Sequence, residues 1–269
     1  MEKNNKTGVF LTGGGGIGAF HIGFFKAMKE AGLKYDLVVG GSVGALVGGG
    51  ATYMTPDEMI EAWNQLTLES VLKIDSRKIQ NLSGVKRNLT LIKECFLSCA
   101  RRDPHLFIDI DDIREQLYAL LDGDKIMESP VDFGMTTTEL PSFKRRDFFK
   151  EDMITNPLEY ILASIYMPVF SRQRMIDDKH YVDLARFRRY PLEMLKEKKC
   201  DNVIVVNIEL ENTNKLTKPM ETLFNNGEDV TFINYETKPS ILDFSREQSD
   251  INYKNGYETS MRVLEKKTR

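Results

Sequence analysis

The sequence predicts an α/β fold, a three-layer α/β/α arrangement with helices on both faces of a mainly parallel central sheet. Three short apolar runs, at 8–12, 37–39 and 203–209, have the composition of buried parallel strands. Apolar residues follow helical spacing over 17–30, and Gly32 supplies a C-terminal stop. This alternation of strands and helices favours a parallel sheet.

The second predicted strand leads directly into a helix that begins after Ser42. A further helix starts at 55–58, where Thr-Pro-Asp-Glu forms a capping box with proline at the first helical position. This helix carries Trp63, the only tryptophan, which we expect to anchor the core. The elements expected beyond it are helices at 84–102, 109–121 and 157–166, strands at 131–138 and 203–209, a hairpin of 173–176 with 180–182, loops over 211–240 and a last helix over about 244–265.

The length of 269 residues suits one large core, so we expect a single domain over 1–269. Its motifs occupy about 8–200, and a C-terminal strand, loops and a helix occupy 201–269. A net charge of −3 argues against a nucleic-acid binder, which would show a basic excess.

Basic residues gather at 144–146, 172–174 and 186–189, and these clusters suit either a solvated surface or an anionic membrane face. The helix expected at 84–102 has two similar interpretations, a helix packed on the core or an interfacial membrane helix. Peripheral contact with a membrane is therefore one of the expectations.

Three cysteines, Cys95, Cys99 and Cys200, form an odd set without the spacing of a metal site. The polar N-terminal residues contain no apolar signal-peptide core, and no run approaches the roughly 18 apolar residues of a membrane span. We therefore expect a cytoplasmic protein with reduced thiols, and no metal or other cofactor.

Four glycines at 13–16 lie between an apolar strand and a helix. Bare backbone N–H groups at a helix N-terminus suit a developing negative charge, which predicts an oxyanion hole. The same glycines satisfy the dinucleotide-binding pattern Gly-x-Gly-x-x-Gly. That use requires an acidic residue at the end of the second strand, which instead ends in Gly-Gly-Ser at 40–42, with Asp36 before the strand.

The sequence around Ser42 is Gly-x-Ser-x-Gly, with Gly40 and Gly44 on either side. An apolar strand runs into this pattern and a helix of small residues leaves it, as in a nucleophile elbow. Ser42 is therefore the predicted nucleophile.

A nucleophilic serine requires a base, and the chain has only His21, His105 and His180. No histidine follows Asp183, so the usual hydrolase order of serine, acid and histidine is absent. We expect His21 to be a packing residue. We expect His105 to lie in a loop and His180 to lie on the surface of a hairpin. Asp183, in a loop that leaves an apolar strand, is the best candidate for a base acting directly on the serine.

With these residues in place, the chain resembles the patatin-like phospholipase family over about 8–200, in one collinear order. The similar segments are LTGGGGIGAFHIGFFKAM at 11–28, GGSVGAL at 40–46, ILASIYMPVFS at 161–171 and YVDLARFRRYPL at 181–192. The family is known for a Ser–Asp dyad in place of a triad.

The resemblance implies that Ser42 is the nucleophile, Asp183 is the general base, and the amides of Gly14, Gly15 and Gly16 form the oxyanion hole. It also implies hydrolysis of acyl esters of phospholipids or other lipids, in a phospholipase A-like manner, at a lipid interface and without a metal. The oligomeric state stays open.

Three departures from the family pattern support an alternative. Ile17 stands where the family usually has a basic residue, Leu184 stands where it has glycine, and Arg188 and Arg189 stand where asparagine is frequent. The alternative is a catalytically weak or inactive relative that binds a lipid or a protein partner.

Overall fold

The computed structural model describes the glycine turn at 13–16, the Gly-x-Ser-x-Gly pattern at 40–44 and Asp183. The described residues are 5–66, 110–166, 176–183, 191–209, 221–225, 227–237, 241 and 243–268. The predictions for the helix at 84–102, for His105, for Cys95 and Cys99, for Leu184 and for Arg188 and Arg189 lie outside the described residues.

A seven-stranded sheet forms the middle layer, in the order β4-β3-β2-β1-β6-β7, with β5 pairing to β3 beside that path. The neighbours from β3 to β7 along this order are parallel, whereas β4 and β5 are antiparallel to β3. The predicted mainly parallel sheet is confirmed. The strands are β1 (Thr7–Leu11), β2 (Leu37–Gly41), β3 (Asp132–Leu140), β4 (Lys144–Phe149), β5 (His180–Val182), β6 (Asn202–Asn207) and β7 (Asp229–Asn234).

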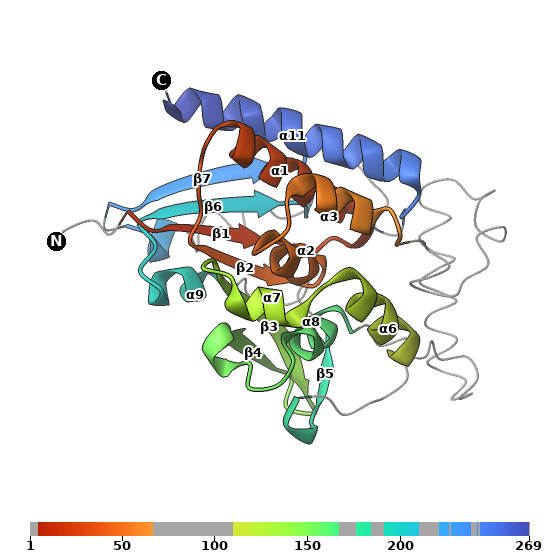
Figure 1. The fold of residues 1–269 in the computed structure, drawn as a ribbon. Helices are drawn as coiled ribbons and strands as arrows, with labels where there is room; N and C mark the ends of the chain where they lie inside the picture. The colour runs from red at the N-terminus through yellow and green to blue at the C-terminus, as the bar shows by residue number, and fades with distance from the viewer. Residues whose placement is uncertain are drawn as a thin grey trace.

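Helices cover both faces of the sheet. Figure 1 shows α1, α3 and α11 together on one side, and α9 packs on β1 and β2 from the other. The predicted three-layer arrangement is therefore confirmed. The helices are α1 (Ala19–Glu30), α2 (Val43–Ala51), α3 (Pro56–Trp63), α6 (Ile110–Leu120), α7 (Gly123–Glu128), α8 (Pro157–Ile165), α9 (Leu192–Glu197) and α11 (Arg246–Thr268), with 3₁₀ turns η1 (Gly15–Gly18), η4 (Lys150–Asp152) and η5 (Ile176–Asp178).

The central strands bury side chains on both faces. Val9 and Leu11 of β1 belong to the core that includes α1 and α3, whereas Phe10 packs on the opposite face with Leu192 and Leu195 of α9. Successive residues of a strand point to opposite faces, so a strand covered on both sides must be apolar throughout. This is why composition alone locates β1, β2 and β6.

The start of α3 follows its sequence signals closely. The Thr55 hydroxyl accepts from the Glu58 N–H at 3.3 Å, and the Glu58 carboxylate accepts from the Thr55 N–H at 2.7 Å, which completes the predicted capping box. Trp63 is buried, as predicted, and its indole N–H donates to Ser249 Oγ of α11 at 3.1 Å. The helix expected over 17–30 begins as the 3₁₀ turn η1 and continues as α1.

One prediction differs from the structure, and a second falls partly outside the described residues, which lack 173–175 of the expected hairpin. The expectation of loops throughout 211–240 is wrong, because β7 extends the sheet beyond β6. β7 is an edge strand that fully buries only Thr231 and Ile233, so its composition is too polar to reveal it. The second strand of the expected hairpin is present as β5, but it pairs with β3, and Ile176 begins η5.

Candidate active site

The turn that carries Ser42 is strained. Ser42 lies between β2 and α2 with φ 55° and ψ −132°, a region that residues other than glycine rarely adopt. A Cβ atom at Gly40 would lie 2.2 Å from the Gly44 carbonyl oxygen, and one at Gly44 would lie 2.3 Å from that of Leu11. Only glycine fits at these two positions, so the sequence forms the tight strand-to-helix turn expected of Gly-x-Ser-x-Gly. Backbone strain of this kind concentrates at functional sites.

A buried serine of α8 holds the backbone of this turn. The Ser42 N–H donates to Ser164 Oγ at 2.8 Å, and the Ser164 hydroxyl donates to the Thr136 carbonyl of β3 at 2.7 Å. Ser164 is 1% exposed, so both of its hydrogen bonds lie away from water. Sequence reasoning missed this residue, because a small polar residue on an apolar helix gives no signal of its partner 122 positions away.

The glycine-rich turn lies against Ser42. A Cβ atom built on Gly13 would lie 3.1 Å from Ser42 Cβ and 3.7 Å from Ser42 Oγ. Gly15 has φ +55°, so glycine is also needed there for its backbone conformation. The structure thus places the start of the glycine-rich turn, at Gly13, against Ser42.

The three glycines predicted to form the oxyanion hole differ in how their amides are used. The Gly16 N–H donates to the Ile241 carbonyl at 2.7 Å. The N–H groups of Gly14 and Gly15 have no hydrogen-bond acceptor among the described residues. Of the three predicted donors, the Gly16 amide is therefore the one already engaged within the described part of the chain.

The strand that leads to Asp183 approaches the end of β2 from the opposite direction. Thr138 of β3 pairs with Arg145 of β4 and also with Val182 of β5, so β4 and β5 lie on opposite edges of β3. β5 therefore occupies the edge that β2 also uses. β2 ends at Gly41 opposite Thr136, and antiparallel β5 ends at Val182 opposite Thr138. The two strand ends approach each other along this edge, one leading to Ser42 and the other to Asp183.

The end of α8 contacts the backbone of both candidate residues. Ser164 accepts from the Ser42 N–H, and two residues later the Tyr166 carbonyl accepts from the Asp183 N–H at 2.6 Å. A single short segment therefore fixes the starting points of both side chains.

His21 is a packing residue, as the sequence analysis expects. Its side chain is fully buried, and its Nε2 lies 2.9 Å from the Thr12 carbonyl, which can only accept, so Nε2 carries the hydrogen. Burial lowers the pKa of His21 from 6.5 to about 4, because the charged imidazolium would lose its hydration. His21 therefore stays neutral near pH 7 and supports the residue just before the glycines. His180 lies in β5 opposite Leu140.

Ile17, which stands where the resembled family usually has a basic residue, is 1% exposed and belongs to the core beneath α1. A charged side chain could not occupy this place without loss of hydration. The departure at this position is thus built into the packing of η1.

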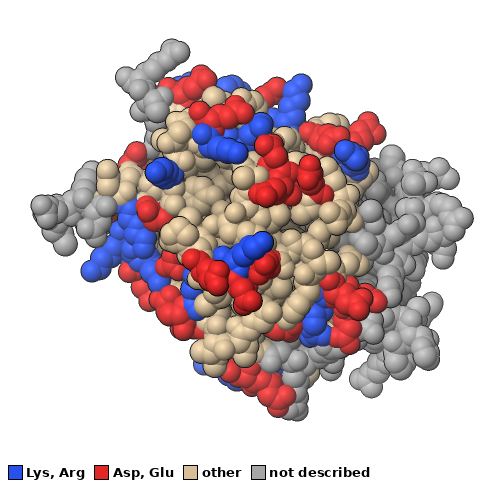
Figure 2. Space-filling model, in the orientation of Figure 1, with Lys and Arg blue, Asp and Glu red and all other residues tan. Residues whose placement is uncertain are grey.

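Acidic partners accompany the basic cluster at 144–146. Arg145 lies 2.8 Å from Asp147, and Arg146 lies 2.9 Å from Glu139. Figure 2 shows the same mixture of Lys and Arg with Asp and Glu over the visible face. Paired charges of this kind are weakly attractive to an anionic surface.

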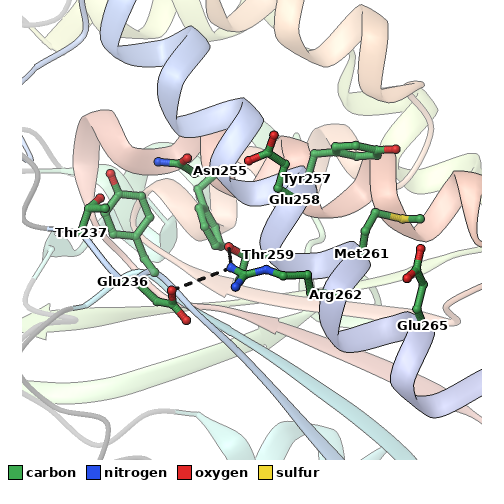
Figure 3. Close-up of a pocket in the computed structure, with 11 residues that line it drawn as sticks. Glu236, Thr237, Asn255, Tyr257, Glu258, Thr259, Met261, Arg262 and Glu265 are labelled. Carbon is green, nitrogen blue, oxygen red and sulfur yellow. Dashed lines mark hydrogen bonds and ion pairs between the residues drawn. The ribbon is translucent and has the colours of Figure 1, made fainter.

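Within the described part of the chain, no group of three or more His, Cys, Asp or Glu side chains is placed to hold a metal ion. Figure 3 shows a pocket of about 480 Å³ between α11 and the residues that follow β7. Its Arg262 lies 3.8 Å from Glu236, and both side chains are exposed, so the pair is weak. The lining includes neither Ser42 nor Asp183, so this pocket is distinct from the candidate active site.

The fold and the strained serine beside a glycine turn define an α/β protein of the nucleophile-elbow class. The family described as patatin-like phospholipase matches residues 9–196, more than half of the chain. The chain belongs to the patatin-like phospholipase family.

Curated relatives match over shorter stretches. A patatin-like phospholipase domain-containing protein of Caenorhabditis elegans is 43% identical over 56 residues, which is 21% of this chain and 4% of that protein. Neuropathy target esterase sws of Drosophila melanogaster is 54% identical over 44 residues, which is 16% of this chain and 3% of that protein. The chain thus spans a small fraction of the curated relatives it matches.

Among solved structures, VipD from Legionella pneumophila has the same fold, with a TM-score of 0.53 and 14% identity. The superposition covers 97% of this chain and 67% of the VipD chain. At this identity the likeness extends to the fold alone.

Proposed function

We propose that the protein is a lipid acyl hydrolase that cleaves acyl esters through Ser42, with Asp183 as the general base. The observation that supports the proposal is the approach of β2 and β5 along one edge of β3, since β2 leads into Ser42 and β5 leads into Asp183. Membership of the patatin-like phospholipase family supports a lipid ester as the substrate.

In the proposed reaction the Asp183 carboxylate takes the proton from Ser42 Oγ while Oγ attacks the ester carbonyl carbon. The carbonyl oxygen becomes an oxyanion, which the N–H groups of Gly14 and Gly15 stabilise. The proposal requires the Asp183 carboxylate to reach Ser42 Oγ in the substrate complex, where catalytic hydrogen bonds commonly tighten.

The tetrahedral intermediate then collapses. The bond from the acyl carbon to the alcohol oxygen breaks, and the alcohol leaves with the proton held by Asp183. Asp183 then takes a proton from water while the water oxygen attacks the acyl carbon. The bond from that carbon to Ser42 Oγ breaks and Asp183 returns the proton to Oγ, which releases the fatty acid and restores Ser42. Gly16 has a different role in this scheme from the one predicted, since its amide already holds the turn to Ile241.

The finer parts of the proposal concern substrate and place. We propose phospholipase A-like cleavage of phospholipids by a cytoplasmic protein that contacts a membrane peripherally and binds no nucleic acid. None of the described helices combines the length and the apolar character that a membrane crossing requires.

The test is fatty-acid release from mixed zwitterionic and anionic phospholipid vesicles, without added metal. Wild type should release fatty acid and lysophospholipid, Ser42→Ala should fall to background, and Asp183→Asn should lose about 10³-fold, within the usual range for general acid–base catalysis. The matched controls Ser142→Ala and Asp177→Asn alter exposed residues and should keep full activity. Undiminished release by Ser42→Ala would sink the proposal, and full activity of Asp183→Asn would point to a histidine base.

A second candidate function is that of a non-catalytic member that binds a lipid or a protein partner. The burial of Ile17, which leaves no basic side chain at that position beside the glycine turn, favours it. A fluorophosphonate probe separates the two candidates. Prompt labelling of wild type but not of Ser42→Ala supports the hydrolase, whereas absence of labelling together with intact vesicle binding supports the binding protein.

A further inference from the structure

Two residues of the C-terminal part of the chain hydrogen-bond the glycine turn, one at the N–H and one at the carbonyl of Gly16. The Gly16 N–H donates to the Ile241 carbonyl at 2.7 Å, and the Gly16 carbonyl accepts from Asn252 Nδ2 of α11 at 3.3 Å. Both partners lie beyond residue 196, where the match to the family ends. We propose that Asn252 is a positioning residue for the oxyanion hole, a role that rests on the proposed function.

The Asn252 side chain is itself fixed in one orientation. It is completely buried, and its Oδ1 accepts from the Tyr235 hydroxyl at 2.8 Å and from Gln248 Nε2 at 3.0 Å. The Gly16 carbonyl can only accept, so the amide nitrogen must be the atom that faces it. A buried amide with both ends bonded can hold a neighbouring backbone firmly, because releasing it would leave polar groups unpaired.

The same part of the chain also contacts the turn sterically. A Cβ atom at Gly15 would lie 2.2 Å from the Ile241 carbonyl oxygen, and one at Gly16 would lie 2.4 Å from that of Asp243. The turn therefore rests directly on the backbone of Ile241 and of Asp243. With Gly16 held by its N–H and its carbonyl, the adjacent amides of Gly14 and Gly15 have little freedom to change direction.

α11 provides Asn252 with a rigid base. α11 lies along α1 (Figure 1), and the two helices approach at glycines in both. A Cβ atom at Gly23 of α1 would lie 2.0 Å from the Tyr253 carbonyl oxygen, and one at Gly256 of α11 would lie 2.1 Å from that of Phe20. This close packing fixes the place of α11 beside the turn, and with it the place of Asn252 relative to Gly16.

The first test compares Asn252→Leu with Ser249→Ala, a neighbouring buried position on α11 whose side chain accepts from Trp63, whereas the described partners of Gly16 are Asn252 and Ile241. The rate of hydrogen–deuterium exchange of the Gly16 N–H should rise at least about 10-fold in Asn252→Leu. It should stay near the wild-type value in Ser249→Ala. In the vesicle assay, kcat per folded molecule should fall about 10- to 100-fold in Asn252→Leu with KM within about threefold, since a small misplacement of donors is costly. Unchanged exchange, or unchanged kcat with raised exchange, overturns the proposal.

A second pair keeps the test valid if Asn252→Leu does not fold. Tyr235→Phe removes one hydroxyl that bonds Asn252, and Tyr257→Phe removes one that bonds Glu30 at 2.5 Å instead. Only Tyr235→Phe should lower kcat, by a few-fold, and raise exchange at Gly16; equal behaviour of the two overturns the proposal. An inactive wild type would refute the proposed function, and the exchange measurement would still decide whether Asn252 holds the turn.

Discussion

The strained turn at Ser42 and the neighbouring glycine turn obtain their support from different parts of the chain. Ser42 is held by Ser164 and β3, which lie within the residues that match the family. The glycine turn is held by Ile241 and Asn252, which lie beyond them. The two turns of this candidate site are thus in contact and still depend on separate supports. Damage to one support should leave the other turn intact.

The largest effect on kcat is expected from Gly15→Ala, in the glycine turn. The new Cβ would lie 2.2 Å from the Ile241 carbonyl oxygen, and φ +55° disfavours alanine, so the turn must move away from its support. We expect kcat for acyl-ester hydrolysis to fall about 10²-fold, the range for loss of an oxyanion donor. Labelling of Ser42 by a fluorophosphonate should slow in parallel.

Gly32→Ala is the matched control for this change. Gly32 also has positive φ, +67°, but a Cβ atom there would meet nothing within 4 Å. It should lose stability without losing kcat. If kcat falls equally in both alanine variants, the glycine turn does not depend on contact with Ile241, and the separate support inferred for it is wrong.

An intermediate effect is expected from Ser164→Ala, which removes the acceptor of the Ser42 N–H. The strained φ of Ser42 then has less support, and a buried unpaired N–H costs about 1–3 kcal/mol. We expect kcat to fall about 10-fold, while amide exchange at Gly16 stays at the wild-type value, because the glycine turn has its own support.

Ser129→Ala is the control for Ser164→Ala. Ser129 likewise accepts a backbone N–H, from Val131 at 3.1 Å, and donates to a carbonyl, that of Thr52 at 2.6 Å. Stability measured by urea unfolding should decrease in both variants, but only Ser164→Ala should slow hydrolysis. A raised exchange at Gly16 in Ser164→Ala would mean that the two turns share one support.

The smallest effect concerns stability and pH. The unfolded chain protonates His21 near pH 6.5, whereas the folded protein does so only near pH 4, because His21 is buried beside the glycine turn. Its contribution to stability is therefore complete above pH 6.5 and decreases as the pH falls toward 4, by at most about 1.4 kcal/mol per pH unit. Urea unfolding at pH 7, 6 and 5 should show this slope in wild type and a smaller slope in His21→Gln. Equal slopes would show that His21 is not the group responsible.

The sequence was most informative where a local pattern sets the structure. Each of these patterns determines the structure of its own few residues. They are the apolar runs of β1, β2 and β6, the capping box at Thr55 and the glycines around Ser42. β7 escaped detection because an edge strand buries few side chains and its partner lies earlier in the chain. Its position follows from pairing with β6, which no local pattern encodes.

The candidate site shows the same division. Ser42 and Asp183 were predicted as candidates from motifs, and the glycine turn from its composition. The residues that hold them were not found, because Ser164 acts on a residue 122 positions away and Asn252 on one 236 positions away. Serine and asparagine on a helix are ordinary surface residues in sequence, and only the packing of α8 and α11 gives them partners.

The place of β6 in the sheet has a practical meaning for anyone preparing fragments of this chain. β6 lies immediately beside β1, in the middle of the sheet, although it begins after the family match ends at residue 196. A fragment cut at that boundary would expose the whole length of β1 as an open edge, with bare backbone donors and acceptors and an uncovered apolar face. Such edges recruit other chains, so the fragment should precipitate or associate.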